Sequence, residues 1–416
     1  WMSGNPQPDA AALQNLFQAG QAFAQGFMNV MAGQPDAQPV SAAQSPQNEA
    51  ISRLQKEFAE RHAKLWQRML QQQGGSAMPT VGDDGGTPRW DKRFASPAWS
   101  ESPYYDYVRQ AYLLNAEFIA RLVESAPLDD EAARNRLKFF SRQFVDAMAP
   151  SNFVATNPEF IKTALETQGA SITAGIQNLV ADLGKGRISM TDDAAFEVGR
   201  NLATTPGRVV FENDLIQLIQ YAPSTNKVFE RPLLIVPPCI NKFYILDLQP
   251  ENSFVRHAVE QGMTVFLVSW RNPQAELGQL GWEDYVELGA LKALDVVREI
   301  GGADKLNALG FCVGGTILSA ALSVAKARGE DPATSLTLLT TLLDFSDGGE
   351  VVNYLDEASV AAREAAIGKG GLLRGAELAS AFSSLRANDL IWQYVVGNYL
   401  KGGKPPAFDL LYWNAD

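Results

Sequence analysis

Cys312 is the residue whose sequence surroundings point most clearly to chemistry. It lies in residues 310–315 (GFCVGG), where Gly310, Gly314 and Gly315 surround it at the spacing of a nucleophile elbow, G-x-nucleophile-x-G. Such an elbow is a sharp turn between a strand and a helix, and residues without a Cβ let the two approach closely. The start of the helix directs free N–H groups and a positive dipole end at the nucleophile, which favours a thiolate. The spacing therefore predicts that Cys312 is a catalytic nucleophile.

A second loop could stabilise the negative oxygen that forms when a nucleophile attacks a carbonyl. This loop is contained in residues 236–242 (VPPCINK), directly after an apolar run. In enzymes built around such an elbow, the earlier loop provides one backbone N–H, and the residue after the nucleophile provides another. The prolines before Cys239 have no N–H, so the predicted donors are the backbone N–H groups of Cys239, or of Ile240, and of Val313. The Cys239 side chain would then be only a small apolar filler.

The base that a cysteine nucleophile needs is not evident from the sequence. Both histidines, His62 and His257, precede Cys312, whereas the usual order around this elbow is nucleophile, acid, base. We therefore expect His257 to be a surface or helix-packing residue. Asp344 follows the next apolar run, where an acid could lie, but its neighbourhood, residues 344–348 (DFSDG), favours a role in forming a turn.

The elements that must position these residues alternate between strand and helix. Residues 208–212 and 215–221 predict a hairpin. Four continuous apolar runs predict strands buried on both faces, and helical patterns lie between them: strands at 232–236, 264–269, 305–311 and 335–342, and helices at 253–261, 284–300 and 313–328. This alternation predicts a mostly parallel α/β sheet.

The remaining segments are helical in pattern. The apolar residues from Leu13 to Met31 recur at three- and four-residue steps, which indicates an amphipathic helix that packs on the chain's own core or binds a partner or an apolar surface. We expect no new buried strand after residue 346. The predicted organisation is a weakly ordered arm over 1–48, a helical domain over 49–205, the sheet domain over 206–346 and a helical cap insertion over 347–416.

Composition excludes several classes of function. The chain has 35 basic and 47 acidic residues and a formal net charge of −12, which argues against nonspecific binding of nucleic acid. Two cysteines and two histidines provide neither a disulfide framework nor a metal motif. No basic residue precedes Arg53, as a signal peptide would require, and no apolar run reaches the roughly 18 residues of a membrane span. We expect a soluble, cytoplasmic protein.

Three further stretches, together with the elbow, resemble one enzyme family. Residues 310–315 resemble the lipase-like box of the polyhydroxyalkanoate synthases, and residues 237–250 (PPCINKFYILDLQP), 266–273 (FLVSWRNP) and 411–416 (LYWNAD) are similar to the class I members. The resemblance implies an α/β-hydrolase-like sheet and an acyltransferase without a cofactor. Such an enzyme polymerises (R)-3-hydroxyacyl-CoA into polyester and releases CoA. It also implies a homodimer at the surface of a cytoplasmic granule.

Carried over to this sequence, the family's mechanism gives a role to each motif residue. Cys312 would hold the acyl group as a thioester, and the backbone N–H groups of Val313 and Cys239 would form the oxyanion hole. The family's catalytic aspartate and histidine lie beyond the LYWNAD motif, so we expect neither in this chain, and Asp416 is not the triad acid. We accordingly expect these 416 residues alone to be inactive and their sheet to be incomplete.

Two other functions fit the same residues. A thiol-type hydrolase of this fold would cleave an ester, because the elbow does not distinguish water from a hydroxyl acceptor. An inactive fragment that binds an apolar granule through its N-terminal arm belongs to a different class. Accumulation of polymer, rather than of free hydroxy acid, would distinguish the synthase from the hydrolase.

Overall fold

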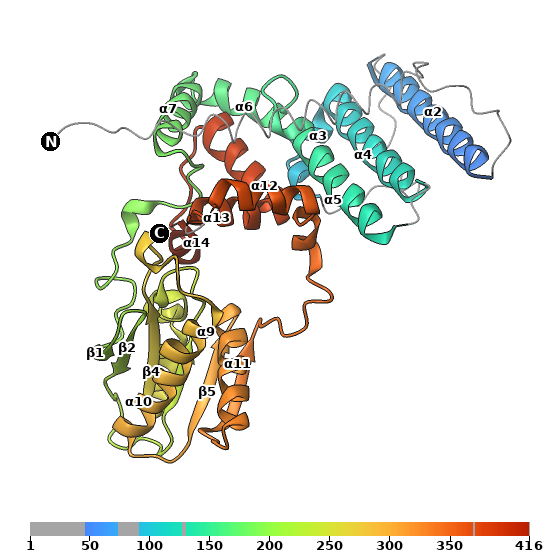
Figure 1. Ribbon diagram of the computed structural model, residues 1–416. Helices are drawn as coiled ribbons and strands as arrows, with labels where there is room; N and C mark the ends of the chain where they lie inside the picture. The colour runs from blue at the N-terminus through green and yellow to red at the C-terminus, as the bar shows by residue number, and fades with distance from the viewer. Residues whose placement is uncertain (1–45, 74–90, 127–129, 369–370, 416) are drawn as a thin grey trace. The chain divides into compact units, whose positions relative to one another are not determined.

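Figure 1 shows the computed structural model of the chain, which describes residues 46–73, 91–126, 130–368 and 371–415. The chain forms two compact units. The helical unit comprises the residues up to Ser189 together with Arg386–Pro405, and the sheet unit comprises Met190–Leu385 and Pro406–Asp416. Two segments thus differ from the expected division, since 190–205 group with the sheet and 386–405 with the helices. The predicted amphipathic helix of the arm lies outside the described residues.

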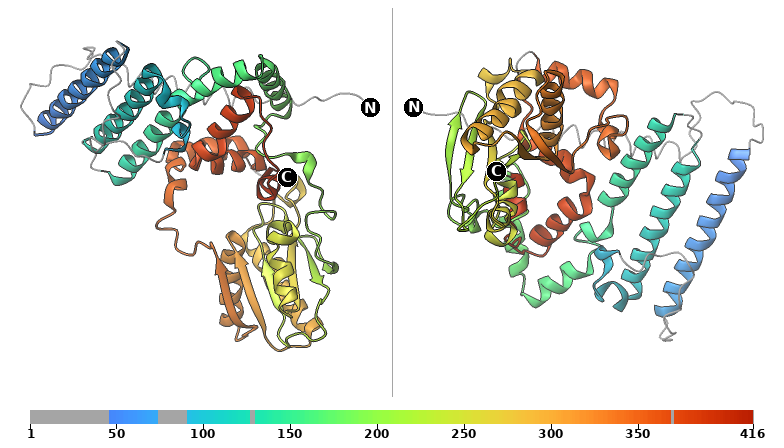
Figure 2. Two further views of the ribbon diagram at one scale, coloured as in Figure 1. Left: turned by 180° about the vertical axis from the view of Figure 1, so that it is seen from behind. Right: turned by 90° about the horizontal axis from the view of Figure 1, so that it is seen from below.

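The helical unit is built mainly from helices that pack against one another. Its main helices are α2 (Pro46–Gln73), α3 (Ala98–Glu101), α4 (Pro103–Glu124), α5 (Glu131–Ala147), α6 (Pro158–Glu166) and α7 (Ala170–Lys185), followed much later by the π-helices η9 (Asn388–Trp392) and η10 (Val395–Leu400). Asp130 and Asn157 cap α5 and α6 by accepting hydrogen bonds from backbone N–H groups of the first turn. Helices α2, α4 and α5 lie side by side (Figure 2). None of the described helices is both long and apolar enough to span a membrane.

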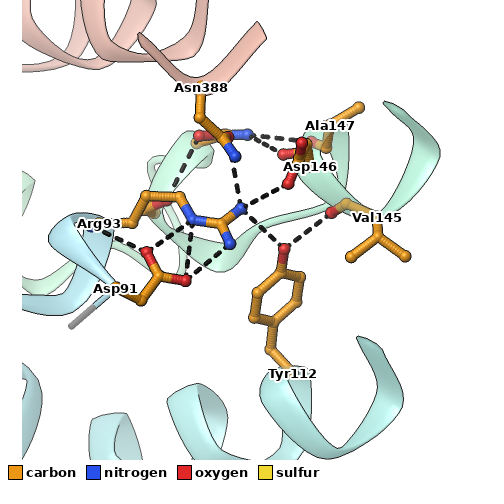
Figure 3. Close-up of polar contacts among 9 residues, drawn as sticks. Asp91, Arg93, Tyr112, Val145, Asp146, Ala147 and Asn388 are labelled. Atoms are coloured by element: carbon orange, nitrogen blue, oxygen red, sulfur yellow. Dashed lines mark hydrogen bonds and ion pairs between the residues drawn. The ribbon is translucent and has the colours of Figure 1, made fainter. Parts of the chain in front are cut away.

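A partly buried arginine joins the late segment of the chain to the early helices (Figure 3). The Arg93 guanidinium donates to the Asp91 carboxylate, to Asp146 Oδ1 at 3.1 Å and to Tyr112 Oη at 2.9 Å. The same nitrogen that reaches Tyr112 also donates to Asn388 Oδ1 at 3.4 Å. These partners raise the pKa of Arg93 despite its burial, so the guanidinium stays charged. The polar network places the start of segment 386–405 against α4 and α5.

The sheet unit contains six strands in the order β1-β2-β4-β3-β5-β6. The strands are β1 (Gly207–Glu212), β2 (Ile216–Tyr221), β3 (Leu233–Val236), β4 (Val265–Trp270), β5 (Leu306–Phe311) and β6 (Ala333–Leu339). Strands β1 and β2 form the predicted antiparallel hairpin, and β4, β3, β5 and β6 are parallel to one another. The prediction of a mostly parallel α/β sheet is therefore confirmed.

Helices cover both faces of this sheet. The helix α10 (Lys292–Gly301), the π-helix η7 (Tyr285–Leu291) and the elbow helix α11 (Val313–Ala327) pack on one face, and α8 (Phe254–Glu260) packs on the other. After β6 the described residues form only helices and loops. These helices are η8 (Gly349–Tyr354), α12 (Glu357–Ile367) and α13 (Gly375–Leu385), and α14 (Asp409–Ala415) follows after the segment that belongs to the helical unit.

Three details of the sheet unit differ from the sequence prediction. The apolar run 335–342 was expected to be buried on both faces, but residues 334–337 of β6 are exposed. The reason is that β6 is the last strand of the described sheet, with a strand neighbour on only one side. The strand also ends early, at Leu339, because Thr340 has a positive φ of 45°. The predicted helix 284–300 is not uniform, since its first part is the π-helix η7.

Candidate active site

Cys312 occupies a strained turn between β5 and α11. Its backbone angles are φ 53° and ψ −131°, a combination that residues other than glycine rarely adopt. Strand β5 ends at the preceding residue, and α11 begins at the next residue, Val313. This is the strand–turn–helix geometry that the spacing predicts. A strained backbone of this kind is stable only where the surrounding structure imposes it.

The three elbow glycines lie where the chain has no room for a side chain. A Cβ at Gly310 would overlap the Cα of Gly315, so the end of the strand and the first turn of the helix touch directly. A Cβ at Gly314 would overlap the carbonyl oxygens of Val236 and Pro237, and one at Gly315 would overlap the side chain of Thr341. Each glycine therefore permits a different close contact. Gly310 allows β5 to touch α11, Gly314 allows α11 to touch the loop after β3, and Gly315 allows α11 to touch the residues after β6.

Hydrogen bonds anchor the elbow to the end of the neighbouring strand. The Cys312 N–H donates to the Leu339 carbonyl at 2.9 Å, and the Cys312 carbonyl accepts from the Gly315 N–H at 2.8 Å. On the first turn of α11, the Thr316 hydroxyl donates to the Leu342 carbonyl at 2.8 Å. The end of β6 and the residues after it thus fix the orientation of the elbow, a role that sequence spacing alone did not reveal.

The predicted oxyanion loop lies beside the elbow. Strands β3 and β5 are parallel neighbours, with Val236 paired to Gly310, so the loops that follow them leave the same edge of the sheet. Burial, followed by a smaller contribution from the Cys312 thiol, raises the pKa of the Cys239 thiol. The two thiols are thus close enough to interact electrostatically. The Val313 N–H lies in the first turn of α11, where a helix has no internal acceptor.

The structure places His257 and His62 in ordinary helical surroundings. His257 is exposed on α8, and no hydrogen bond between described residues joins it to Cys312. The expectation that His257 is a surface residue is therefore confirmed. His62, in the helical unit, lies 3.4 Å from the Tyr107 hydroxyl through its Nε2 and packs beside Phe58.

Asp344 has the turn-forming role that its neighbourhood predicts. Its Oδ1 accepts a hydrogen bond from the Ser346 N–H at 2.9 Å, and this bond lowers the pKa of the exposed carboxyl. Asp416 is outside the described residues. Among the described positions, no three His, Cys, Asp or Glu side chains come together as a metal site would require.

Two buried polar side chains, neither of them predicted from the sequence pattern, form hydrogen bonds with residues that follow β3. Trp270, at the end of β4, donates a hydrogen bond from its indole Nε1 to the Pro237 carbonyl at 2.8 Å. Asp247, 1% exposed, accepts hydrogen bonds at Oδ1 from the hydroxyls of Thr205 at 2.6 Å and Ser253 at 2.5 Å. Both lie in stretches that resemble the synthases, and a lone charged residue within the apolar sequence YILDL was the only local signal for Asp247.

Two family descriptions cover most of the chain. Residues 90–258 match "Poly-beta-hydroxybutyrate polymerase (PhaC) N-terminus", and residues 232–416 match "alpha/beta hydrolase fold". The second match agrees with the sheet order and with the elbow described above.

Named relatives point to the same family. The chain is 53% identical over 368 residues to "Poly(3-hydroxyalkanoate) polymerase subunit PhaC" of Cupriavidus necator, covering 87% of this chain and 61% of the relative. It is 43% identical to the protein of the same name from Rhizobium meliloti, covering 85% and 58%, respectively. It is 44% identical to "Poly(3-hydroxyalkanoate) polymerase" of Methylorubrum extorquens, and the match covers 88% of this chain and 61% of the relative. The chain thus spans about three fifths of these relatives' length. By both family descriptions and these identities, the chain is similar to the poly(3-hydroxyalkanoate) polymerases over most of its length.

Proposed function

We propose that Cys312 is the nucleophile of an acyltransferase that polymerises (R)-3-hydroxyacyl-CoA into polyester. The observation that carries this proposal is the strained backbone of Cys312, φ 53°, at the start of α11 and beside the loop of Cys239. Maintaining such strain costs on the order of 1–3 kcal/mol, and residues of this kind cluster at active sites. The names of the relatives support polyester as the product.

The proposed reaction needs only acyl exchange. The Cys312 sulfur attacks the thioester carbonyl of the substrate, the carbonyl carbon's bond to the CoA sulfur breaks, and CoA leaves as the thiol after taking a proton. The hydroxyl of another acyl unit then attacks an enzyme-bound thioester carbonyl. This step forms an ester bond and returns the cysteine thiol. Exchange of one thioester for another is nearly balanced in free energy, whereas ester formation from a thioester is favourable. No cofactor takes part.

The backbone N–H groups of Val313 and Cys239 are the proposed oxyanion donors. Donors fixed before the reaction stabilise the negative oxygen without reorganising during it. Because they are main-chain groups, their placement depends on the packing of two loops rather than on side-chain identity. We do not assign the base to His257, which is exposed on α8.

The proposed setting is the one that the resemblance to the synthases implies. A growing polyester is insoluble, which favours work at the surface of a polymer granule, and the resemblance adds a cytoplasmic location and a homodimer to the proposal. CoA thioester and polymer are its only proposed ligands.

Substitution of the nucleophile in the full-length protein tests the proposal. Cys312→Ala should abolish both CoA release and polymer formation, and Cys312→Ser should be severely impaired, because a hydroxyl ionises far less readily than a thiol. Ser323→Ala removes an exposed hydroxyl from the same helix and is the matched control. If the Cys312→Ala protein retains more than a few per cent of wild-type CoA release, Cys312 is not the nucleophile. If CoA release yields free hydroxy acid without polymer, the enzyme is a thiol hydrolase.

A further inference from the structure

Trp270 connects the end of β4 to the loop that carries the proposed oxyanion donor. The side chain is 6% exposed, and its Nε1 donates to the Pro237 carbonyl at 2.8 Å. A buried indole N–H needs an acceptor, and here the acceptor is a main-chain carbonyl in the loop between β3 and Cys239. One side of the Pro237 carbonyl is therefore held by the sheet.

The other side of this carbonyl is held by the elbow helix. The Pro237 oxygen lies so close to Gly314 that a Cβ there would overlap it. The carbonyl is thus fixed between an indole and the first turn of α11, two residues after Cys312. Only Pro238 separates this fixed point from Cys239, and proline restricts its own φ to about −65°. The direction of the Cys239 N–H consequently depends on where the Pro237 carbonyl is held.

The position of the indole is itself determined by the π-helix η7. A Cβ at Gly289 would lie 2.5 Å from Cζ3 and 2.6 Å from Cη2 of Trp270, so the ring occupies the space of a missing side chain. The Tyr285 ring packs against the indole, with centroids 5.4 Å apart and an interplanar angle of 35°. Burial, followed by a contribution from the Cys239 thiol, raises the pKa of Tyr285, so this ring also lies near the oxyanion loop. Single π-turns are frequent at functional sites.

We infer that Trp270 is a positioning residue, whose indole N–H holds the Pro237 carbonyl and thereby sets the Cys239 backbone N–H relative to Cys312. The inference rests on the proposed function, because it assigns Trp270 to the oxyanion hole of that reaction. Trp270 does not touch the reacting atoms. Its effect is confined to steps in which a carbonyl oxygen gains negative charge.

Two reactions of Cys312 separate this role from simple packing. Acylation by p-nitrophenyl butyrate forms the sulfur–carbonyl bond through a negatively charged oxygen, releases p-nitrophenolate and passes the thiol proton to solvent. Alkylation by iodoacetamide forms a sulfur–carbon bond and releases iodide without any oxyanion. Both modifications are measured by the mass of the peptide that contains Cys312 in the full-length protein.

Trp270→Phe removes the N–H and keeps an aromatic ring. We expect acylation of Cys312 to slow about tenfold or more, since a displaced donor loses much of its effect, while alkylation stays within about twofold. Trp282→Phe, at a position that is 50% exposed in the same unit, is the control and should change neither rate. Unchanged acylation in Trp270→Phe would overturn the inference, and so would an equal fall in both rates, which would indicate loss of packing.

Gly289→Ala provides a second variant that leaves the indole intact. Its Cβ should displace the ring and weaken the bond to Pro237, giving the same selective loss of acylation; Gly281→Ala, where the added Cβ meets nothing within 4 Å, is its control. Equal acylation in Gly289→Ala and Gly281→Ala would count against the inference even if Trp270→Phe does not fold. Wild-type protein that is never acylated at Cys312 would instead refute the proposed function itself.

Discussion

The Cα of Gly314 lies directly against the carbonyl oxygen of Pro237, with no space for even a Cβ between them. This contact joins the first turn of the nucleophile helix to the loop that carries the second proposed oxyanion donor. The two donors therefore come from segments that are locked together through main-chain atoms.

Gly314→Ala should disrupt this contact. The added methyl has backbone on its far side and cannot be accommodated by a rotamer change, so we expect a loss of about 1–3 kcal/mol in the free energy of unfolding. CoA release should fall at least tenfold, because the two donors are pushed apart. Urea unfolding and the CoA assay check both effects. Gly184→Ala, at a helical position with nothing within 4 Å, should instead leave stability equal or higher by up to about 1 kcal/mol.

Gly315→Ala should be rescued in part by a second substitution. The Cβ at position 315 would overlap the Oγ1 of Thr341 and lie 2.8 Å from its Cγ2, both side-chain atoms. Thr341→Ala removes these two atoms, although its own Cβ would remain at 3.0 Å. We expect the double variant to be more stable than Gly315→Ala alone, as measured by thermal unfolding. Additive losses in the double variant would show that the overlap is not the cause.

The elbow could be predicted from sequence because its determinants are local. A strained nucleophile between a strand and a helix requires small residues at fixed offsets, and Gly310, Gly314 and Gly315 occupy those offsets. The buried strands were predictable for a similar reason, since continuous apolar runs bounded by turns have few alternatives. The exposure of β6 was not predictable, because burial depends on which elements cover a strand.

Long-range contacts explain what the sequence did not reveal. Arg93 bonds to Asn388 across 295 positions, and no local pattern around Asn388 indicates that its segment belongs with the helical unit. The local sequence around Trp270 indicates only the end of an apolar strand. Its role emerges only when the strand order places it beside Pro237.

Cys239 should be tolerant of substitution. Only its backbone N–H is proposed to act, so Cys239→Ala should retain CoA release within about threefold of wild type. A fall of tenfold or more in a variant that unfolds at the wild-type temperature would assign a role to the side chain.

The Cys239 thiol should also react slowly with iodoacetamide at neutral pH. Burial raises its pKa, and a protonated thiol is a poor nucleophile. The pH at which its alkylation rate reaches half of its maximum should therefore lie above the pKa of an ordinary thiol, about 8.5. Peptide mass analysis across pH 7–11 measures this rate, and a half-maximal rate at or below pH 8.5 would contradict the assignment.

Asp247 should make the sheet unit less stable as the pH rises. Burial raises its carboxyl pKa, an effect that the hydroxyls of Ser253 and Thr205 only partly oppose, and its Oδ2 has no hydrogen-bond partner among the described residues. The folded state therefore retains the proton to a higher pH than the unfolded state does. Stability is greatest below the unfolded-state pKa of about 3.9, falls as the pH rises from there to the folded-state pKa, and is constant above it.

Asp247→Asn removes this titration, so its stability relative to wild type should increase from pH 4 upward in urea unfolding. Asp344→Asn is a control of opposite sign. The pKa of Asp344 is lowered by the Ser346 N–H, so wild type should gain stability relative to that variant as the pH rises from the lowered folded-state pKa to the unfolded-state pKa of about 3.9, and the difference should stay constant above it. If wild type instead becomes more stable relative to Asp247→Asn as the pH rises, the effect of the two hydroxyls on the Asp247 pKa is larger than that of burial, and Asp247 is stabilised as a carboxylate.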